Sequence, residues 1–561
     1  MLVRLVNLFD RTILPVRLHL QEGIISQIEP VSEVPDGTPF ALPGFVDAHV
    51  HIESSMLPPT EFARMALVHG TVATVSDPHE IANVLGMEGV QYMLDNARHS
   101  PLKFCFGAPS CVPSTPFETA GAVLTAQEVG ILLQDPSIGY LSEVMNFPGV
   151  LKKDPELMAM IAAAQAVNKP VDGHAPGLTG ADAAIYFAAG ISTDHECFTL
   201  EEGREKAQLG VQLLIREGSA ARNFEALWPL LQEFPNQVHF CSDDKHPDEL
   251  LRGHINELAR RAIEKGCDLF DVLRAACVNP VLHYRLPVGL LRKGDPADFI
   301  LVEDLVQLTV LSTWINGEKV AEQGNCQLPF FAPACPNKFN ALPLQPEDFE
   351  ISAPISATIE EISTVFPVLK MGKQVAVRVI GARDGQLVTD PLIEHLPVTS
   401  YGLLPDTSKD LLFITVVNRY DPESSPAMAF VRGFGLREGA IASSVAHDSH
   451  NIVAVGTDAA SLSRAVNAVI AAKGGVSATN KSGEVRILEL PIAGLMSPME
   501  GPALAKSYQA LDSWVKTELG SSLQAPFMTL SFLALPVIPS LKITDWGLFD
   551  VDTFGFTSVY V

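Results

Sequence analysis

Histidines and carboxylates recur at the ends of short apolar segments of this chain, beginning with "PGFVDAHVHIESS" at residues 43–55. Side chains alternate between the two faces of a β-strand, so His49, His51 and Glu53 are expected on one side of this segment. Taken alone, the motif also fits an edge strand with a solvated polar face. Its chemical meaning depends on partners supplied by other segments.

Seven later segments repeat the same order of a β-rich apolar run, a polar cluster and a stretch of helical length. The eight segments end in "FVDAHVHIES", "TVATVSDPHE", "KFCFGAPSCVP", "GYLSEVMNFPG", "KPVDGHAPG", "GISTDHEC", "VQLLIREGS" and "VHFCSDDKHP". This alternation predicts an α/β fold of the (β/α)8 TIM-like barrel type, which needs about 250 residues. A doubly wound open sheet is the alternative, but no G-x-G-x-x-G follows a strand, and polar clusters end nearly every strand.

Parallel barrel strands bring their C-terminal ends to one mouth, where these polar clusters would meet. The expected mouth residues are His49, His51, Asp77, His79, Glu80, Glu143, His174, His195, Glu196, Glu217, Asp243 and Asp244. Each alone fits a helix cap or a satisfied buried histidine, but together they would be costly to desolvate unless cations neutralise them. Imidazoles and carboxylates without thiolates favour zinc, iron or manganese, and their number indicates two ions. Two such ions support hydrolytic chemistry.

The composition is that of an acidic globular protein. Its 561 residues, 47% hydrophobic and 19% charged, provide core material for several domains. The balance of 39 Lys and Arg against 65 Asp and Glu gives a net charge of −26, which disfavours nucleic acids and anionic membranes but permits an uncharged small-molecule substrate. The eight cysteines form no C-x-x-C pair, and charges interrupt the N-terminal apolar stretch. We therefore expect a cytoplasmic protein without an export signal or membrane span.

Longer stretches of the chain resemble a known family. "LPGFVDAHVHIESSMLPPTEFAR", "SDPHEIANVLG", "VDGHAPGLTG", "SDDKHPDELL" and the C-terminal "GFGLREGAIASSVAHDSHNIVAVG" are similar to the adenine deaminases of the amidohydrolase superfamily. The resemblance covers essentially the whole chain. It implies hydrolysis of adenine to hypoxanthine and ammonia with two divalent ions, manganese or iron in the first place and zinc as the alternative. It also implies a homo-oligomer.

The resemblance further implies a role for individual residues. The implied metal ligands are His49, His51, Glu143, His174, His195 and Asp243. Glu143 would bridge the ions at a position where many superfamily members use a carboxylated lysine. A bridging hydroxide would attack C6 of adenine, with Asp243 as proton shuttle and His195 holding the developing oxyanion. Residues expected to bind substrate or orient the ligands are Asp77, His79, Glu80, Glu196, Glu217, His447, Asp448, His450 and Asn451.

The remaining segments predict a multidomain chain. In the superfamily the two flanks of the barrel meet in a small β-sandwich, which would here combine residues 1–41 and 287–330 around a barrel at 42–286. A Pro-rich linker at 331–345 would lead to a C-terminal α/β domain at 346–561. In that domain "SSVAHDSHNI" fits either a contact with the pocket or an internally bonded turn. The segment upstream of it, 418–432, lacks the basic, His-containing sequence of many family members.

Other functions fit parts of the pattern. The same ions could deaminate another nucleobase or open a cyclic amide, which a panel of substrates separates. A cytidine-deaminase fold needs a C-x-x-C pair and zinc proteases need H-E-x-x-H, and neither occurs in the chain. A catalytically inactive metal or purine sensor has no need for a nucleophile together with a shuttle carboxylate.

Overall fold

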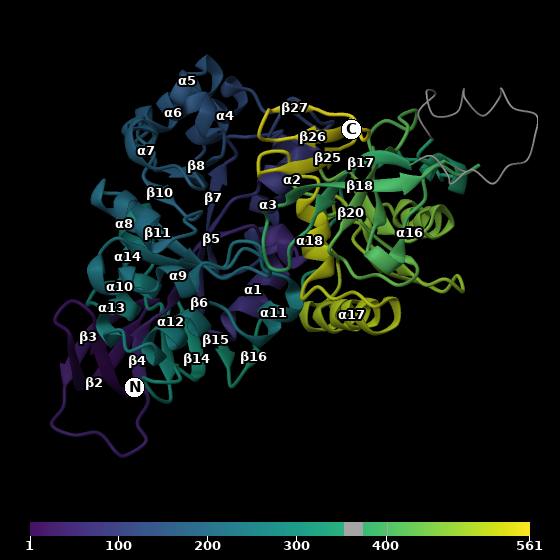
Figure 1. Ribbon diagram of the computed structural model, residues 1–561. Coiled ribbons are helices and arrows are strands. Elements are labelled where there is room, and N and C mark those ends of the chain that lie inside the picture. The colour runs from purple at the N-terminus through teal and green to yellow at the C-terminus, as the bar shows by residue number, and fades with distance from the viewer. Residues whose placement is uncertain (353–373, 401) are drawn as a thin grey trace, which may run out of the picture.

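The structure of the protein is a computed structural model that describes residues 1–352, 374–400 and 402–561. It consists of two lobes (Figure 1), the N-terminal one coloured purple to teal and the C-terminal one green to yellow. Within the described ranges, none of the helices combines the length and apolarity needed to span a bilayer.

Eight parallel strands form the centre of the N-terminal lobe. They are β5 (Phe45–Val50), β6 (Thr71–Ser76), β7 (Lys103–Ala108), β8 (Ile138–Val144), β9 (Val171–Gly173), β10 (Thr193–Asp194), β11 (Gln212–Arg216) and β12 (Val238–Cys241). The first five pair in sequence order and the last three form a second parallel sheet. A parallel bridge between Val50 and Asp243 brings the last strand back to the first. This curled arrangement fits the predicted TIM-like barrel.

Helices follow the barrel strands and cover their outer side (Figure 1). They are α1 (Pro59–Leu67), α2 (His79–Leu85), α3 (Met87–Ala97), α4 (Ala126–Gln134), α5 (Phe147–Lys152), α6 (Pro155–Ala166), α7 (Gly180–Ala188), α8 (Leu200–Gln208), α9 (Phe224–Leu227), α10 (Leu230–Glu233), α11 (Pro247–Arg252), α12 (Ile255–Glu264), α13 (Leu269–Leu273) and α14 (Asn279–Tyr284). Local sequence sets several of their ends. The Thr125 side chain accepts from the Glu128 backbone in a capping box before α4. Gly190, with a φ of 105°, follows α7 in a conformation that favours glycine.

The segments on either side of the barrel share one eight-stranded sheet. Its order is β16 (Asn325–Cys326), β15 (Glu318–Glu322), β14 (Val310–Ile315), β13 (Phe299–Val302), β4 (Phe40–Pro43), β1 (Leu2–Asn7), β2 (Thr12–Gln21) and β3 (Ile24–Pro30). Buried Asp298 ties this sheet to the barrel, because Lys103 at the start of β7 donates to its Oδ2 at 2.5 Å.

A second eight-stranded sheet organises the C-terminal lobe. Its order is β18 (Asp390–Pro397), β17 (Gln374–Gly381), β20 (Ala427–Arg432), β19 (Leu412–Val417), β22 (Ile452–Gly456), β21 (Ala440–Ser443), β23 (Gly475–Thr479) and β24 (Val485–Glu489). Alternate residues of β19 enter two cores: Phe413 packs in the core that contains α16 (Ala459–Ala472), whereas Leu412 and Ile414 belong to the core that continues into the barrel. The sheet therefore has a helix on one face and joins the barrel core through the other.

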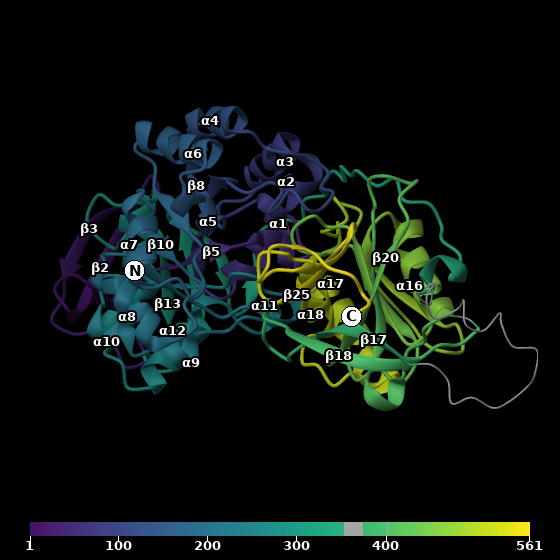
Figure 2. The ribbon, with the colours of Figure 1, turned by 45° about the horizontal axis from the view of Figure 1, so that its top comes forward.

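Several C-terminal elements lie between the lobes. They are α17 (Gly501–Trp514), α18 (Pro526–Phe532), β25 (Leu541–Thr544), β26 (Gly547–Asp550) and β27 (Gly555–Phe556). Helix α17 packs against α1 and α11 of the barrel, and Figure 2 shows these helices together at the junction. The Pro-rich segment also docks here, since the Ala493 N–H donates to Pro336 O at 2.7 Å.

Candidate metal centre

Six side chains of the types that bind divalent cations converge at the C-terminal ends of the barrel strands. Each of them is at most 8% exposed, although four carry imidazoles and two carry carboxylates. They are His49, His51, Glu143, His174, His195 and Asp243. These residues lie near the C-terminal ends of β5, β8, β9, β10 and β12 or just after them. Parallel strand packing therefore brings the six groups together.

Glu143 lies between two groups of histidines. Its Oε1 is 3.4 Å from His51 Nε2. Its Oε2 is 2.8 Å from His174 Nδ1 and 3.3 Å from His195 Nε2. The two oxygens of one carboxylate thus face different imidazoles, as a ligand shared by two cations would.

Asp243 completes the side formed by the H-x-H pair. Its Oδ1 is 3.6 Å from His49 Nε2 and 3.4 Å from His51 Nε2, and the two histidine nitrogens are 3.1 Å apart. His49 also stacks on His195, with ring centroids 4.2 Å apart. Because these nitrogens and oxygens all point toward one another, the arrangement concentrates lone pairs.

The electrostatics of the mouth favour positive charge. Burial raises the pKa of Asp243, but Arg216 and His51 outweigh burial and hold this pKa well below its usual range. For His51, burial lowers the pKa, but the carboxylates of Asp244 and Asp243 raise it well above its usual range. By contrast, burial and neighbouring histidines keep the pKa of His49 well below its usual range, so this imidazole is neutral and able to act as a ligand.

The residues present fit divalent cations. Several overlapping groups place ligand atoms within 4.8 Å of one another, among them His49–His195–Asp243 and Glu143–His174–His195. Imidazole and carboxylate donors without thiolates suit zinc, iron or manganese. The chemistry of this donor set therefore supports a divalent metal centre.

Arg216 is a pocket residue that the sequence pattern did not predict. It ends β11, donates through both Nη atoms to Glu196, and donates from Nη1 to Asp243 Oδ2 at 2.8 Å. Despite burial, this guanidinium lowers the pKa of Glu196 to about 2. The available signal in the sequence was an arginine at the end of the apolar run "VQLLIR".

The "SDPHE" segment contributes a further imidazole. Asp77 accepts from the His79 backbone at 3.1 Å and from Ser142 Oγ at 2.8 Å, which fixes the start of α2. His79 Nδ1 lies 3.6 Å from Glu143 Oε1, and its Nε2 lies 3.7 Å from Asp448 Oδ1. His79 therefore stands between the metal-binding groups and the C-terminal lobe.

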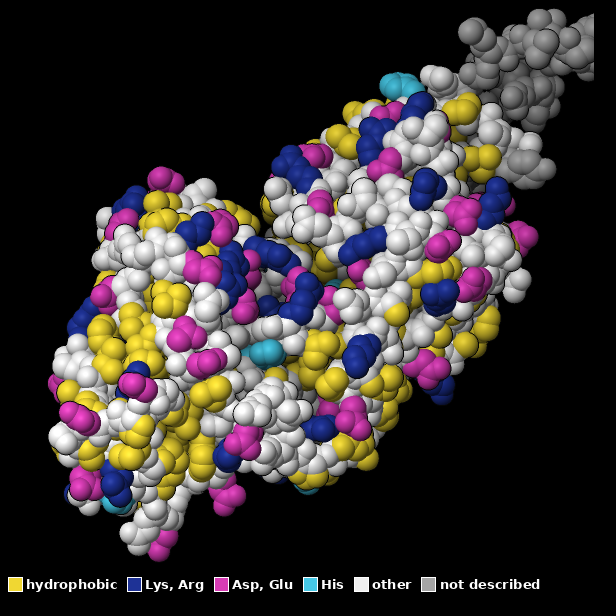
Figure 3. Space-filling model, turned by 90° about the horizontal axis from the view of Figure 1, so that it is seen from below, with side chains coloured by type: hydrophobic (Ala, Val, Ile, Leu, Met, Phe, Trp, Pro, Cys, Tyr) yellow, Lys and Arg dark blue, Asp and Glu magenta, His cyan; other side chains and the backbone are white. Residues whose placement is uncertain are grey.

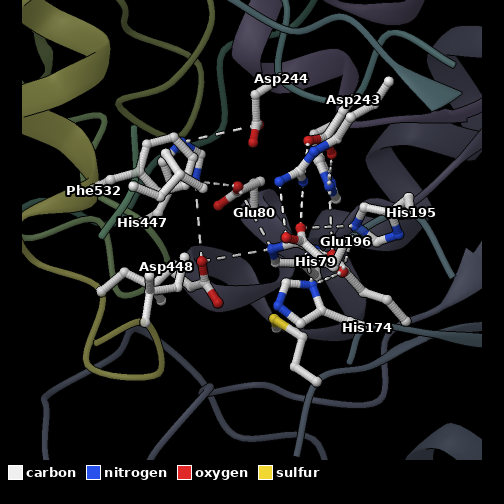
Figure 4. Close-up of a pocket in the computed structure, with 17 residues that line it drawn as sticks. His79, Glu80, His174, His195, Glu196, Asp243, Asp244, His447, Asp448 and Phe532 are labelled. Carbon is white, nitrogen blue, oxygen red and sulfur yellow. Dashed lines mark hydrogen bonds and ion pairs between the residues drawn. The ribbon is translucent and has the colours of Figure 1, made fainter. Parts of the chain in front are cut away.

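The "HDSHN" turn between β21 and β22 reaches the same pocket. His447 and Asp448 line it opposite His174 and His195, as Figure 4 shows. Asn451 does not line it: this side chain donates to Thr119 O at 2.8 Å and accepts from the Arg419 backbone. The turn thus combines pocket contacts with support from the 418–432 segment, because the Arg419 N–H donates to Asn451 and the Tyr420 hydroxyl donates to Ser449 O.

The structure corrects the expected positions of Glu53 and Glu217. Strand β5 ends at Val50, so Glu53 leaves the phase of the H-x-H pair and instead accepts from the Ile81 N–H at 3.1 Å. Glu217 lies outside the pocket, because it pairs with Arg261 at 2.6 Å.

An extended strand through both aspartates would turn Asp244 away from Asp243. Strand β12 ends at Cys241, and the backbone at Asp243 is left-handed with a φ of 53°. Both aspartates consequently line the pocket, and Asp244 accepts from Ser54 Oγ at 2.5 Å.

The pocket is narrow and adjoins a larger cavity. Beside the six groups it has a volume of about 30 Å³ and an apolar wall formed by Leu387, Phe532, Leu535 and Ile538. A neighbouring cavity of about 490 Å³ shares Met145, Glu196 and Ile538 with it. Figure 3 shows the two lobes from below, with Lys and Arg side chains around the hollow between them.

Comparison with known proteins gives matches over nearly the full length. Residues 40–320 match the amidohydrolase family, and residues 386–555 match the adenine deaminase C-terminal domain. An adenine deaminase of Salinibacter ruber is 54% identical over 558 residues, covering 100% of this chain and 98% of that protein. An adenine deaminase of a Sulfurovum species is 54% identical over 98% of both chains.

Among solved structures, N-acetyl-D-glucosamine-6-phosphate deacetylase from Mycobacterium smegmatis matches 57% of this chain and 99% of its own. The identity is 16% and the TM-score is 0.44. With the barrel, the cation-binding side chains and the full-length relatives taken together, the chain belongs to the adenine deaminase family of the amidohydrolases.

Proposed function

We propose that the protein hydrolyses adenine to hypoxanthine and ammonia. The observation that carries this function is the convergence of six buried imidazoles and carboxylates at the barrel mouth, in a chain 54% identical to adenine deaminases over its full length. An uncharged purine also suits a protein with a net charge of −26, which repels anionic substrates.

The residues that would hold two divalent ions are His49, His51, Glu143, His174, His195 and Asp243. Manganese or iron is the proposed metal, with zinc as the alternative. Divalent ions held there supply Lewis-acid chemistry and make water nucleophilic at neutral pH. The position of Glu143 between two sets of histidines supports its proposed role as the shared ligand.

Asp243 is the proposed proton carrier. Arg216 keeps it ionised, so its carboxylate is able to accept the proton of the attacking water and deliver it toward the ring and the leaving amine. His195 lies 3.3 Å from both Glu143 and Glu196 and would hold the oxygen that develops negative charge at C6. The apolar wall limits access of bulk water to the reacting atoms.

The experiment that tests this function measures ammonia release and identifies the product. Metal-free protein is reconstituted separately with manganese, iron and zinc and supplied with adenine, guanine, cytosine and a cyclic amide. We expect ammonia and hypoxanthine in equal amounts from adenine with at least one metal. Turnover of another compound in preference to adenine contradicts the proposed substrate.

The domain boundaries given above also stay proposals. The sheet shared by residues 2–43 and 299–326 supports the β-sandwich assignment, and the sheet with α16 supports a separate C-terminal α/β domain. A homo-oligomer is likewise proposed from the family alone.

A further inference from the structure

A carboxylate of the barrel is held by two histidines of the other lobe. Glu80 stands in the first turn of α2, and His447 and His450 stand 367 and 370 residues later in the turn after β21. His447 Nδ1 bonds to Glu80 Oε1, and His450 Nε2 bonds to Glu80 Oε2. All three side chains are at most 2% exposed.

The backbone determines which nitrogen of His450 carries the proton. The Ala446 N–H donates to His450 Nδ1 at 3.2 Å, so Nδ1 must present a lone pair. A neutral His450 therefore carries its proton on Nε2 and donates it to Glu80. Burial lowers the pKa of His450, in keeping with a neutral ring.

This proton arrangement argues against a cation between Glu80, His447 and His450, although their ligand atoms lie close enough to hold one. A metal-binding imidazole normally donates its other N–H to an acceptor. His450 does the opposite, because its other nitrogen accepts from the backbone. The group is built as a hydrogen-bond chain from backbone to His450, Glu80 and His447.

This series of hydrogen bonds ends at His447, in the pocket. With Nδ1–H donated to Glu80, the His447 ring presents Nε2, which is buried and lacks a hydrogen-bond partner among the described residues. Asp244 Oδ1 is 4.0 Å away. Phe532 stacks on the ring with centroids 4.4 Å apart and a 16° tilt, which fixes its plane (Figure 4).

We propose that His447 contacts the substrate and donates an Nε2–H hydrogen bond to a ring nitrogen of the purine, while Glu80 and His450 act as positioning residues. This inference rests on the proposed function. Addition at C6 moves electron density onto the ring nitrogens, so such a hydrogen bond strengthens as the reaction proceeds. Burial lowers the pKa of His447, but Glu80 and Asp244 raise it to about 9, so both ring nitrogens carry protons near neutral pH.

The test uses adenine analogues in which one ring nitrogen is replaced by CH. Competitive inhibition constants of 1-, 3- and 7-deazaadenine are compared with the KM of adenine for the metal-loaded wild type and for His447→Ala. We expect one analogue to bind the wild type about 10- to 100-fold more weakly, as the loss of a hydrogen bond to a charged group predicts. In His447→Ala this penalty should shrink to within about twofold, because the donor has gone.

Further variants separate contact from structural support. His447→Gln retains an N–H donor and should recover part of the roughly 10²-fold loss in kcat/KM expected for His447→Ala. Glu80→Gln should reduce the analogue penalty without loss of metal. The matched control is His246→Gln, since this buried histidine bonds to Tyr508 of the C-terminal lobe at 2.7 Å outside the pocket and should keep the wild-type penalty.

Two results overturn the proposal while leaving the deaminase function intact. One is an analogue penalty that is the same in wild type and His447→Ala. The other is a third ion per chain in the wild type that Glu80→Gln loses, which would make the three residues a metal site. A wild type that neither binds nor deaminates adenine contradicts the proposed function and this inference together.

Discussion

Asp243 has two proposed roles in the pocket, as a metal ligand and as the proton carrier. One of its oxygens faces the H-x-H pair, and the other accepts from Arg216. Removing the guanidinium would leave Asp243 and Glu196 as buried carboxylates without their counterion, which is strongly unfavourable. The residue types and strand-end positions predicted Asp243 but not Arg216, because a strand pattern does not show which buried charge neutralises which.

The first prediction concerns proton transfer. Asp243→Asn keeps the size of the side chain but removes its ability to accept a proton, so kcat for adenine should fall by about 10² to 10⁴. KM and the fold should change little, which steady-state kinetics and circular dichroism check. Glu217→Gln is the control, because Glu217 pairs with Arg261 outside the pocket and its variant should turn over normally. A loss confined to KM contradicts the shuttle role.

At the scale of elements, the pocket is shaped by the ends of the barrel strands and by side chains that bond distant segments of its wall together. The eight strand segments were predicted from apolar runs followed by polar clusters, and the ligands follow because parallel strands share one mouth. The walls were not predicted: Leu387, Phe532 and Ile538 are apolar residues in segments that resemble ordinary core. Their position depends on contacts between distant segments, which local periodicity does not encode.

Lys542 on β25 is one side chain that bonds distant segments of the wall together. Fully buried, it donates to Leu387 O at 2.7 Å and to Phe532 O at 2.9 Å, so it joins two segments of the apolar wall. Burial lowers the pKa of Lys542 to about 7. The unfolded chain, with an ordinary lysine pKa near 10.4, then binds more protons than the folded chain between about pH 7 and pH 10.

The second prediction follows from that difference. The contribution of Lys542 to stability is fully present above the unfolded pKa and is lost as pH falls toward 7. The unfolding free energy of the wild type relative to Lys542→Met should therefore rise by up to roughly 4 kcal/mol from pH 7 to pH 10. Denaturant unfolding of both proteins at three pH values measures it. A difference that is independent of pH means that Lys542 keeps an ordinary pKa.

At the scale of the whole molecule, the C-terminal lobe closes the barrel mouth. A volume of about 30 Å³ beside the metal-binding groups has room for about two water molecules, so a purine must displace wall side chains or part of the lobe. The adjoining cavity of about 490 Å³ lies between barrel loops and C-terminal segments and borders the same wall at Ile538. Access to the site therefore depends on both lobes.

The third prediction tests that path. Val388 is half-buried at the adjoining cavity, and Val388→Trp should narrow it. We expect kcat/KM for adenine to fall by about tenfold, a barrier change of about 1.4 kcal/mol, with unchanged metal content. Ile393→Trp on exposed β18 is the control and should behave as wild type. Equal kcat/KM in both variants shows that substrate takes another path.

The most direct test of the account is a metal titration of metal-free protein followed by ammonia release from adenine. Manganese is added in measured amounts per chain, and activity and bound metal are determined on the same samples. If His49, His51, Glu143, His174, His195 and Asp243 hold two ions that are both needed, activity rises until two equivalents are bound and then stays constant. Full activity at one bound equivalent, or ammonia release by the metal-free protein, contradicts the two-metal deaminase.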